Sequence, residues 1–221
     1  MGPLVGELLP LGLGVAISPI PIIAAILMLL GQHARTTSVG FALGWVTGIV
    51  AVTVLLVYLS GAIAGDGGSH SQVAWLKLVI GVLLVALGVR NWRGRDGAAT
   101  TPKWMSTIDS LRPIAGFGMG LALAAVNPKN LLLCVGAGTA IGTAGLTGGD
   151  EAVAIVVFSA IAAASVLGPV LAYQIAADRL AAPLDRLRAW LQEHNQAVMA
   201  VLLLVLGVTL FGQGLGGLLA V

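Results

Sequence analysis

Six long apolar segments limit the fold of this chain more than any other feature of its sequence. Their approximate limits are residues 4–30, 40–64, 73–90, 114–140, 152–176 and 196–219. A helix needs about 20 apolar residues to cross the hydrocarbon core of a bilayer, and each segment approaches or exceeds that length. Of the 221 residues, 58% are hydrophobic and 9% are charged, whereas soluble domains carry about a quarter charged residues. The sequence therefore predicts a single all-α integral membrane domain, residues 1–221, with six transmembrane helices.

Basic residues are spread unevenly over the connections between these segments. The first, third and fifth connections, with the adjoining helix ends, hold nine of the 11: Arg35, Arg90, Arg93, Arg95, Lys103, Arg112, Arg179, Arg186 and Arg188. The second and fourth connections hold none, although Lys77 lies just inside the third segment. Because basic loops are retained in the cytoplasm, both termini are expected outside and the linker of about 91–113 inside. The N-terminus lacks a basic region and a cleavage site, so the first span is expected to direct insertion.

The fifth connection carries a helical stripe of leucines beside basic residues, between Leu180 and Leu191. Such a segment predicts a short helix on the inner membrane surface. An ordinary connector of a helix hairpin is the alternative.

Two pairs of segments indicate an internal repeat. Val15–Ile23 resembles Ala124–Leu132 when Pro19 is laid on Pro128, and Val82–Val89 matches Val201–Val208 at six of eight positions. Two halves of three spans each must insert with opposite orientation. The sequence therefore predicts a 3+3 inverted repeat, with halves of about 1–92 and 114–221, an arrangement common among secondary transporters.

Two proline motifs interrupt the first and fourth segments. Ser18-Pro19 and Asn127-Pro128 each place a favoured N-cap residue before a proline at the first helical position, and Pro21 reinforces the first motif. Each proline comes about 15 residues into its segment, or roughly 20 Å of helix, so both breaks are expected near mid-membrane. A half-helix that restarts there presents free N–H groups and a positive dipole end, which attract anions.

Lys129 adds a full charge beside the second break. A lysine at the centre of a membrane helix costs about 2.5–3.5 kcal/mol and usually has a partner or an aqueous cavity. The nine acidic residues all lie in connections or toward helix ends. Two interpretations stay open: the partner is an anionic group of a cargo molecule, or Lys129 donates to carbonyls freed at the first break. Asn127 and Asn130 have the same alternatives, as ligand donors or in interhelical hydrogen bonds.

The candidate substrate site therefore contains seven residues, with a gate or interfacial anchor toward the inner end of the fifth segment. The site residues are Ser18, Pro19, Pro21, Asn127, Pro128, Lys129 and Asn130, and the gate residues are Tyr173 and Gln174.

Several function classes have little support in the sequence. The single cysteine, Cys134, excludes an intramolecular disulfide, and the three histidines lack the spacing of metal ligands. No nucleophile and base pair or acid pair shares a membrane depth, so an enzyme is not expected. No cofactor and no nucleic-acid partner is expected either. The sequence also lacks a nucleotide-binding loop and the intramembrane acids that proton coupling usually requires.

Glycines spaced four residues apart allow close helix packing. They occur as Gly40-x3-Gly44-x3-Gly48 and as Gly212-x3-Gly216. Packing inside the monomer is the favoured use, and a homodimer interface is the alternative.

Five stretches carry a resemblance to a known family: SPIPIIAAILML, WLKLVIGVLLVALGVRNWRG, PKWM, VNPKNLLL and APLDRLRAWLQEHNQAVMAVLLLVLG. Over essentially its whole length the chain resembles the GAP family, the peptidoglycolipid-addressing or sulfolipid-addressing group within the lysine-exporter (LysE) superfamily. The resemblance implies a six-span protein of the bacterial inner (plasma) membrane that helps to export lipids or glycolipids. The motif residues of the family carry over onto Pro19, Pro21, Asn127, Pro128, Lys129 and Asn130.

The leading hypothesis is export of an anionic lipid or glycolipid from the inner to the outer leaflet for cell-envelope assembly. Its head group is expected at Lys129 and at the half-helix ends, while its tails stay in lipid. One alternative is a small-solute exporter of the amino-acid type. Another is a non-transporting scaffold that recruits envelope-synthesis enzymes through its basic inner loops.

Overall fold

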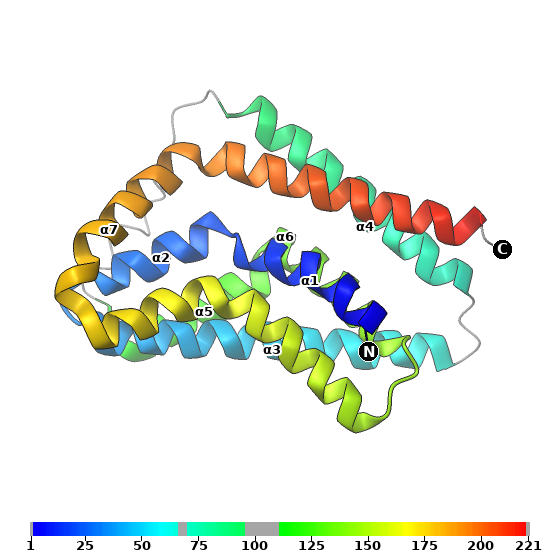
Figure 1. Cartoon of the computed structure of the whole chain (residues 1–221), viewed down its shortest axis with the longest axis horizontal. Coiled ribbons are helices and arrows are strands. Elements are labelled where there is room, and N and C mark those ends of the chain that lie inside the picture. Colours follow the sequence, from blue (N-terminus) through cyan, green and yellow to red (C-terminus); the bar gives the residue numbers. More distant parts are fainter. Residues whose placement is uncertain (1, 66–69, 96–110, 220–221) are drawn as a thin grey trace.

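The computed structural model describes residues 2–65, 70–95 and 111–219, and this part of the chain is almost entirely helical. The helices are α1 (Gly2–Ala16), α2 (Pro19–Leu29), α3 (Ala34–Gly65), α4 (His70–Arg93), α5 (Pro113–Val126), α6 (Pro128–Gly142) and α7 (Gly148–Leu219). Helix α7 turns back on itself in Figure 1, and its backbone leaves helical geometry at Ala176 (φ −139°, ψ 49°). It therefore supplies two apolar helices, Gly148–Ala177 and Arg179–Leu219.

Four helical segments are long and apolar enough to cross a membrane by themselves. They are Ala34–Ser60, Ser71–Arg93, Gly148–Ala177 and Arg179–Leu219. Two bent pairs raise the number of spans to as many as six: α1 with α2, bent by 53°, and α5 with α6, bent by 67°. Both termini lie toward the same end of the molecule, as an even number of crossings requires (Figure 1). The two predicted helix breaks are therefore confirmed, and the protein is all-helical in its described part.

The helices extend into stretches predicted as connections. Helix α3 already begins at Ala34, α4 at His70 and α7 at Gly148. The predicted inner-surface segment is helical too, but it continues directly into the last span. An apolar pattern marks where hydrocarbon contact ends, whereas a helix continues for as long as its backbone hydrogen bonds can form. The stretches 66–69 and 96–110, which include much of the predicted linker, lie outside the described residues.

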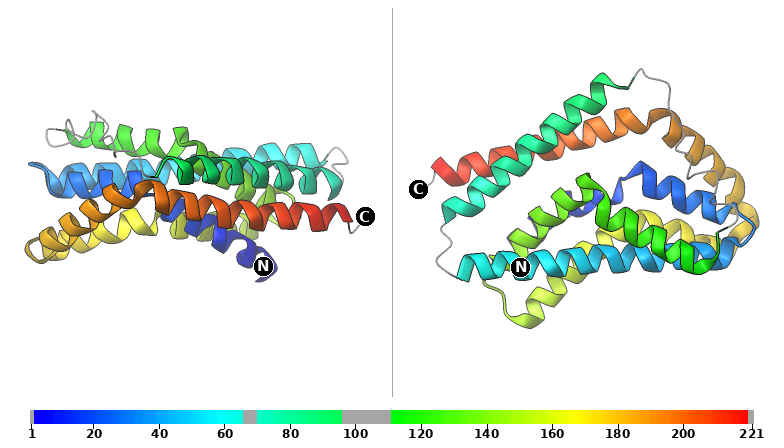
Figure 2. Two further views of the ribbon diagram at one scale, coloured as in Figure 1. Left: turned by 90° about the horizontal axis from the view of Figure 1, so that it is seen from above. Right: turned by 180° about the vertical axis from the view of Figure 1, so that it is seen from behind.

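Glycines bring two pairs of helices into close contact. Along α3 and α5, which run parallel, a Cβ atom at Gly44 would lie 2.0 Å from the carbonyl oxygen of Phe117. Helix α4 packs antiparallel against the C-terminal part of α7, where a Cβ atom at Gly207 would lie 2.7 Å from the backbone nitrogen of Val85. Both pairs lie side by side in Figures 1 and 2.

The two glycine motifs have different outcomes. Gly40, Gly44 and Gly48 pack inside the monomer against α5, as predicted. The prediction of internal packing is wrong for the second motif, because Gly212 and Gly216 have no atom within 4 Å of an added Cβ atom in the described part of the chain. Gly214 and Gly217, on the other face of the same helix, make the contacts with α4 instead.

Helix α2 lies at the centre of the bundle, with nine of its 11 residues buried. The largest fully buried side chains around it include Phe41 and Trp45 of α3 and Phe158 of α7. Since α2 begins at the first break, the enclosed position of this half-helix places that break inside the protein.

Candidate functional site

The first break separates α1 from α2 at Ile17 and Ser18. Ser18 has extended backbone angles (φ −109°, ψ 105°), and Pro19 is the first residue of α2. The predicted cap is wrong, because the Ser18 side chain makes no capping hydrogen bond to α2. Its Oγ donates instead to Oδ1 of Asn130, 3.2 Å away on α6. A partner from a distant helix has replaced the local one.

The second break separates α5 from α6 at Asn127, and here the predicted cap is confirmed. Asn127 is extended (φ −68°, ψ 115°), and Pro128 is the first residue of α6. Oδ1 of Asn127 accepts a hydrogen bond of 3.1 Å from the backbone N–H of Lys129. The side chain therefore satisfies one of the N–H groups that the start of a helix leaves without a partner.

Lys129 joins the two breaks. Its residue is 2% exposed, and its Nζ donates to the carbonyl oxygens of Gly14 at 2.6 Å and Ile17 at 3.3 Å. These carbonyls lie at the end of α1, where the break removes the N–H groups that would continue the helix. The ammonium therefore lies against the negative end of the α1 dipole.

This geometry corrects the predicted electrostatics of the site. The sequence suggested that Lys129 and two positive helix ends share one centre without a counter-charge. Two carbonyl oxygens at the first break instead accept hydrogen bonds from the ammonium, as the capping interpretation predicts. Binding of a cargo anion at Lys129 stays a proposal.

Ser165 of α7 is part of the same polar cluster, and sequence reasoning missed it. Its Oγ donates to the carbonyl oxygen of Ala16 at 2.5 Å. The only local signal is a hydroxyl within an alanine-rich stretch of the fifth segment. Thus α6 and α7 both donate to the end of α1.

Asn130 is a buried cluster residue whose side chain is only half satisfied. Its residue is 1% exposed, and its Oδ1 accepts from Ser18. Its Nδ2 has no hydrogen-bond partner among the described residues. An unpaired buried amide costs about 1–3 kcal/mol, so this donor favours the approach of an acceptor.

The other predicted site residues are less central. Pro19 and Pro21 are buried beside the cluster at the start of α2, whereas Pro128 is exposed. Gln174 Nε2 donates to the carbonyl oxygen of Arg35 at 3.2 Å, near the start of α3. Gln174 lies nine residues beyond Ser165 along α7, or roughly 13 Å. The predicted gate residues, Tyr173 and Gln174, are therefore not brought to the breaks.

Replacing Asn127 with alanine is expected to lower the free energy of unfolding by about 1 kcal/mol, because α6 loses its cap. Asn127→Ser keeps an oxygen acceptor at the same position and is expected to retain most of that stability. Denaturation with SDS in mixed micelles measures both variants. Equal losses for serine and alanine would show that capping is not what Asn127 contributes.

Metal binding has no visible site in the part of the chain that the structure describes. Across 2–65, 70–95 and 111–219, no three His, Cys, Asp or Glu side chains are grouped as metal ligands. The side chains at the breaks that can form hydrogen bonds are one ammonium, two amides and two hydroxyl groups.

Apolar helices that enclose two interrupted spans and a buried polar cluster define a multi-pass integral membrane protein. The profile of a family described as Sap, sulfolipid-1-addressing protein, matches residues 8–216. The chain therefore belongs to the sulfolipid-1-addressing protein family, which confirms the sulfolipid-addressing part of the resemblance seen in its motifs. No curated protein and no solved structure matches the chain.

Proposed function

We propose that this protein is a transporter that moves an anionic lipid or glycolipid from the inner to the outer leaflet of a bacterial plasma membrane, for assembly of the cell envelope. The observation that carries the proposal is the buried ammonium of Lys129. This lysine belongs to the interrupted fourth span and donates to carbonyl oxygens of the interrupted first span. Charged side chains inside membrane spans usually mark a substrate or ion pathway. Membership of a family named for sulfolipid addressing supports a lipid as the cargo.

An anionic head group binds at this site by replacing the carbonyl oxygens of Gly14 and Ile17 as the acceptor of the Lys129 ammonium. Hydrogen bonds to charged groups contribute about 1.5–3 kcal/mol each, so a sulfate or phosphate oxygen competes well with a neutral carbonyl. The unused Nδ2 of Asn130 offers the incoming anion a second donor. Release of Gly14 and Ile17 then frees the end of α1 to move.

Exposed apolar side chains at the two breaks support a path on which the lipid tails stay in the membrane. Ile17 is 41% exposed at the first break and Val126 is 72% exposed at the second. Both apolar side chains directly precede the Ser18-Pro19 and Asn127-Pro128 motifs. A head group enters sideways between the helices while its acyl chains remain outside them.

Contacts between α4 and α7 support an inverted repeat of two three-span halves. Laying Val82–Val89 on Val201–Val208 pairs Gly88 with Gly207, and Val85 with Leu204. An added Cβ atom at Gly88 would meet Leu204, and one at Gly207 would meet Val85. The alignment therefore maps each of these two contacts onto the other, as a two-fold axis in the membrane plane requires.

Contacts at the first and fourth spans also support the inverted repeat. With Pro19 laid on Pro128, Gly12 pairs with Leu121. Gly12 packs against Ile161 of α7, and Leu121 packs against Gly48 of α3. The first part of α7, Gly148–Ala177, and α3 are the second spans of the two halves. Each broken span therefore packs against the second span of the other half.

A purified chain in liposomes tests the cargo. The three probes are phosphatidylglycerol and phosphatidylcholine, each with a fluorescent head or tail label, and radioactive lysine. We expect phosphatidylglycerol to change leaflet about tenfold faster than phosphatidylcholine, the factor that about 1.4 kcal/mol provides, with no protein-dependent lysine flux. Chemical quenching of the outer leaflet measures the lipids.

The same experiment separates the competing functions. Lysine flux without lipid movement would identify a small-solute exporter of the amino-acid type. No movement of any probe would favour a scaffold for envelope-synthesis enzymes. Protein-free liposomes and liposomes with heat-denatured chain provide the baselines.

A further inference from the structure

A second pair of charges lies inside the helices, away from the breaks. Glu7 of α1 and Lys77 of α4 form an ion pair, and their side chains are 24% and 19% exposed. They lie five and seven residues from the first residue of their helices, or roughly 8 and 10 Å along each axis. The other two ion pairs described, Arg188–Asp185 and His194–Glu193, each join neighbours within α7.

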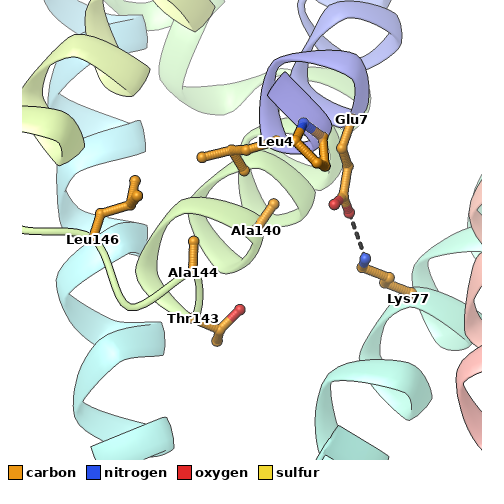
Figure 3. A pocket seen from close by; sticks show the side chains of 8 residues that line it. Leu4, Glu7, Lys77, Ala140, Thr143, Ala144 and Leu146 are labelled. Carbon is orange, nitrogen blue, oxygen red and sulfur yellow. Dashed lines mark ion pairs between the residues drawn. The ribbon is translucent and has the colours of Figure 1, made fainter. Parts of the chain in front are cut away.

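The ion pair spans a gap between two helices that do not otherwise pack. No Cα atom of α1 lies within 8 Å of a Cα atom of α4 in the described structure. Both helices instead contact α6. The side chains of Glu7 and Lys77 point toward each other across this gap (Figure 3).

A cavity of about 370 Å³ fills the same gap. Its lining combines the start of α1, Lys77, and the end of α6 with the turn that follows, and it includes Glu7, Lys77, Thr143 and Leu146. That volume lies at the lower end of the range of small-molecule sites, about 300–1,000 Å³. The cavity therefore has room for a polar head group but not for a whole lipid.

The cavity lies at the far end of α6 from Lys129. Thr143 follows Lys129 by 14 residues, or roughly 21 Å of helix. The positive-inside pattern places this end of the molecule outside, since the connections at 66–69 and 143–147 carry no Lys or Arg. A head group leaving Lys129 along α6 toward the outer leaflet reaches this cavity.

Stability alone does not account for the ion pair. A partly exposed pair contributes about 0–1 kcal/mol, and charges within a membrane span are costly. Helix α1 is also held at its other end by a lysine, because Lys129 binds the carbonyls of Gly14 and Ile17. Two lysines on different helices thus hold the two ends of one short, proline-containing half-helix.

We propose that this cavity is a second head-group site, facing the outer leaflet, in which Lys77 binds the anionic group of a departing lipid after that group has displaced Glu7. The inference rests on the proposed lipid export. The Glu7–Lys77 pair is the closed state of an exit between α1 and α4. Charge selects the occupant, and the open side of the gap leaves the tails in the bilayer.

A photoreactive side chain at Leu146, which lines the cavity, tests the site in nanodiscs that contain phosphatidylcholine and phosphatidylglycerol. Loss of the competing carboxylate in Glu7→Gln is expected to raise cross-linking to phosphatidylglycerol about tenfold. Lys77→Gln is expected to reduce it to the phosphatidylcholine level. The same label at Leu55 of α3, which is 58% exposed, is expected to show no charge preference in any background.

Three results would overturn the proposal. If the ion pair only holds α1 and α4 together, Glu7→Gln and Lys77→Gln have the same effect on cross-linking at Leu146. The exchanged pair, Glu7→Lys with Lys77→Glu, then restores wild-type cross-linking. Competition by millimolar glycerol 3-phosphate would identify a site for soluble anions rather than lipids. Equal labelling of both lipids at Leu146 would remove charge selection. Thermal stability of each variant, measured by size-exclusion chromatography, identifies any that fails to fold.

The outcome is independent of the liposome test of transport. Leaflet exchange with no charge preference at Leu146 would end this inference and leave the proposed function intact. Charge preference at Leu146 without leaflet exchange would leave a head-group site in a protein that does not transport.

Discussion

Export is expected to fall to the rate of protein-free liposomes when Lys129 is replaced with methionine. The substitution keeps an unbranched side chain of similar length but removes the ammonium that binds Gly14, Ile17 and, in the proposed mechanism, the cargo. Removing a charge from the membrane centre gains about 2.5–3.5 kcal/mol, while each lost charged hydrogen bond costs about 1.5–3 kcal/mol. The two lost bonds together cost about 3–6 kcal/mol, so the net loss of stability is about 1–2 kcal/mol at the middle of both ranges. The chain is therefore expected to fold while its transport is lost.

Two further variants show whether the effect belongs to the site. Lys129→Arg keeps a positive charge and is expected to retain part of the flux. Ser60→Ala removes an interhelical hydrogen bond of similar kind, from Ser60 Oγ to the carbonyl oxygen of Gly138 at 2.9 Å, away from the breaks. This control is expected to keep export.

Cells provide the second measurement of the same variant. Comparative lipidomics of the envelope is expected to give the same altered profile for Lys129→Met as for deletion of the chain. Normal flux and a normal profile in Lys129→Met would limit Lys129 to capping α1 and would end the proposal of a cargo site there.

Substituting Gly120 with alanine is expected to cause a large loss of stability. Its Cβ atom would lie 2.2 Å from the carbonyl oxygen of Phe41 and 2.7 Å from the backbone nitrogen of Trp45. Both obstacles are backbone atoms of α3, so the two helices must move apart. Overpacking of this kind costs about 1–3 kcal/mol or more, and the free energy of unfolding in SDS measures it.

The matched control lies two residues away on the same helix. An added Cβ atom at Gly118 has nothing within 4 Å, and alanine is favoured over glycine in a helix by about 1 kcal/mol. Gly118→Ala is therefore expected to leave stability unchanged or to raise it. Equal losses at Gly118 and Gly120 would mean that α3 and α5 are not packed as described.

Local chemistry explains which site features could be predicted from the sequence. A proline lacks the N–H group that a helix interior needs, so Pro19 and Pro128 identify both breaks without any tertiary information. The Asn127 cap was equally predictable, because its partner, the N–H of Lys129, is two residues away. Ser18 has the same local pattern, yet its hydroxyl group donates to Asn130 of another helix instead of capping α2.

Partners from distant helices explain the features that could not be predicted. The carbonyls that bind Lys129 are 112 and 115 residues away in the chain. Ser165 and the Glu7–Lys77 pair likewise meet their partners only after the helices have packed. Glycines also lie on two faces of the last span, and only packing selects Gly214 and Gly217, rather than Gly212 and Gly216, for the contact with α4.

By itself, the sequence determined that the chain is an apolar helical membrane protein, where two of its helices stop and restart, and that one lysine lies beside the second interruption. Those properties follow from hydrophobic length, proline sterics and local capping, which act over a few residues. The tertiary structure alone decided that this lysine binds the end of α1 and that a second lysine spans an open gap to Glu7. The crossing of helices sets which groups meet, and no local pattern encodes that crossing.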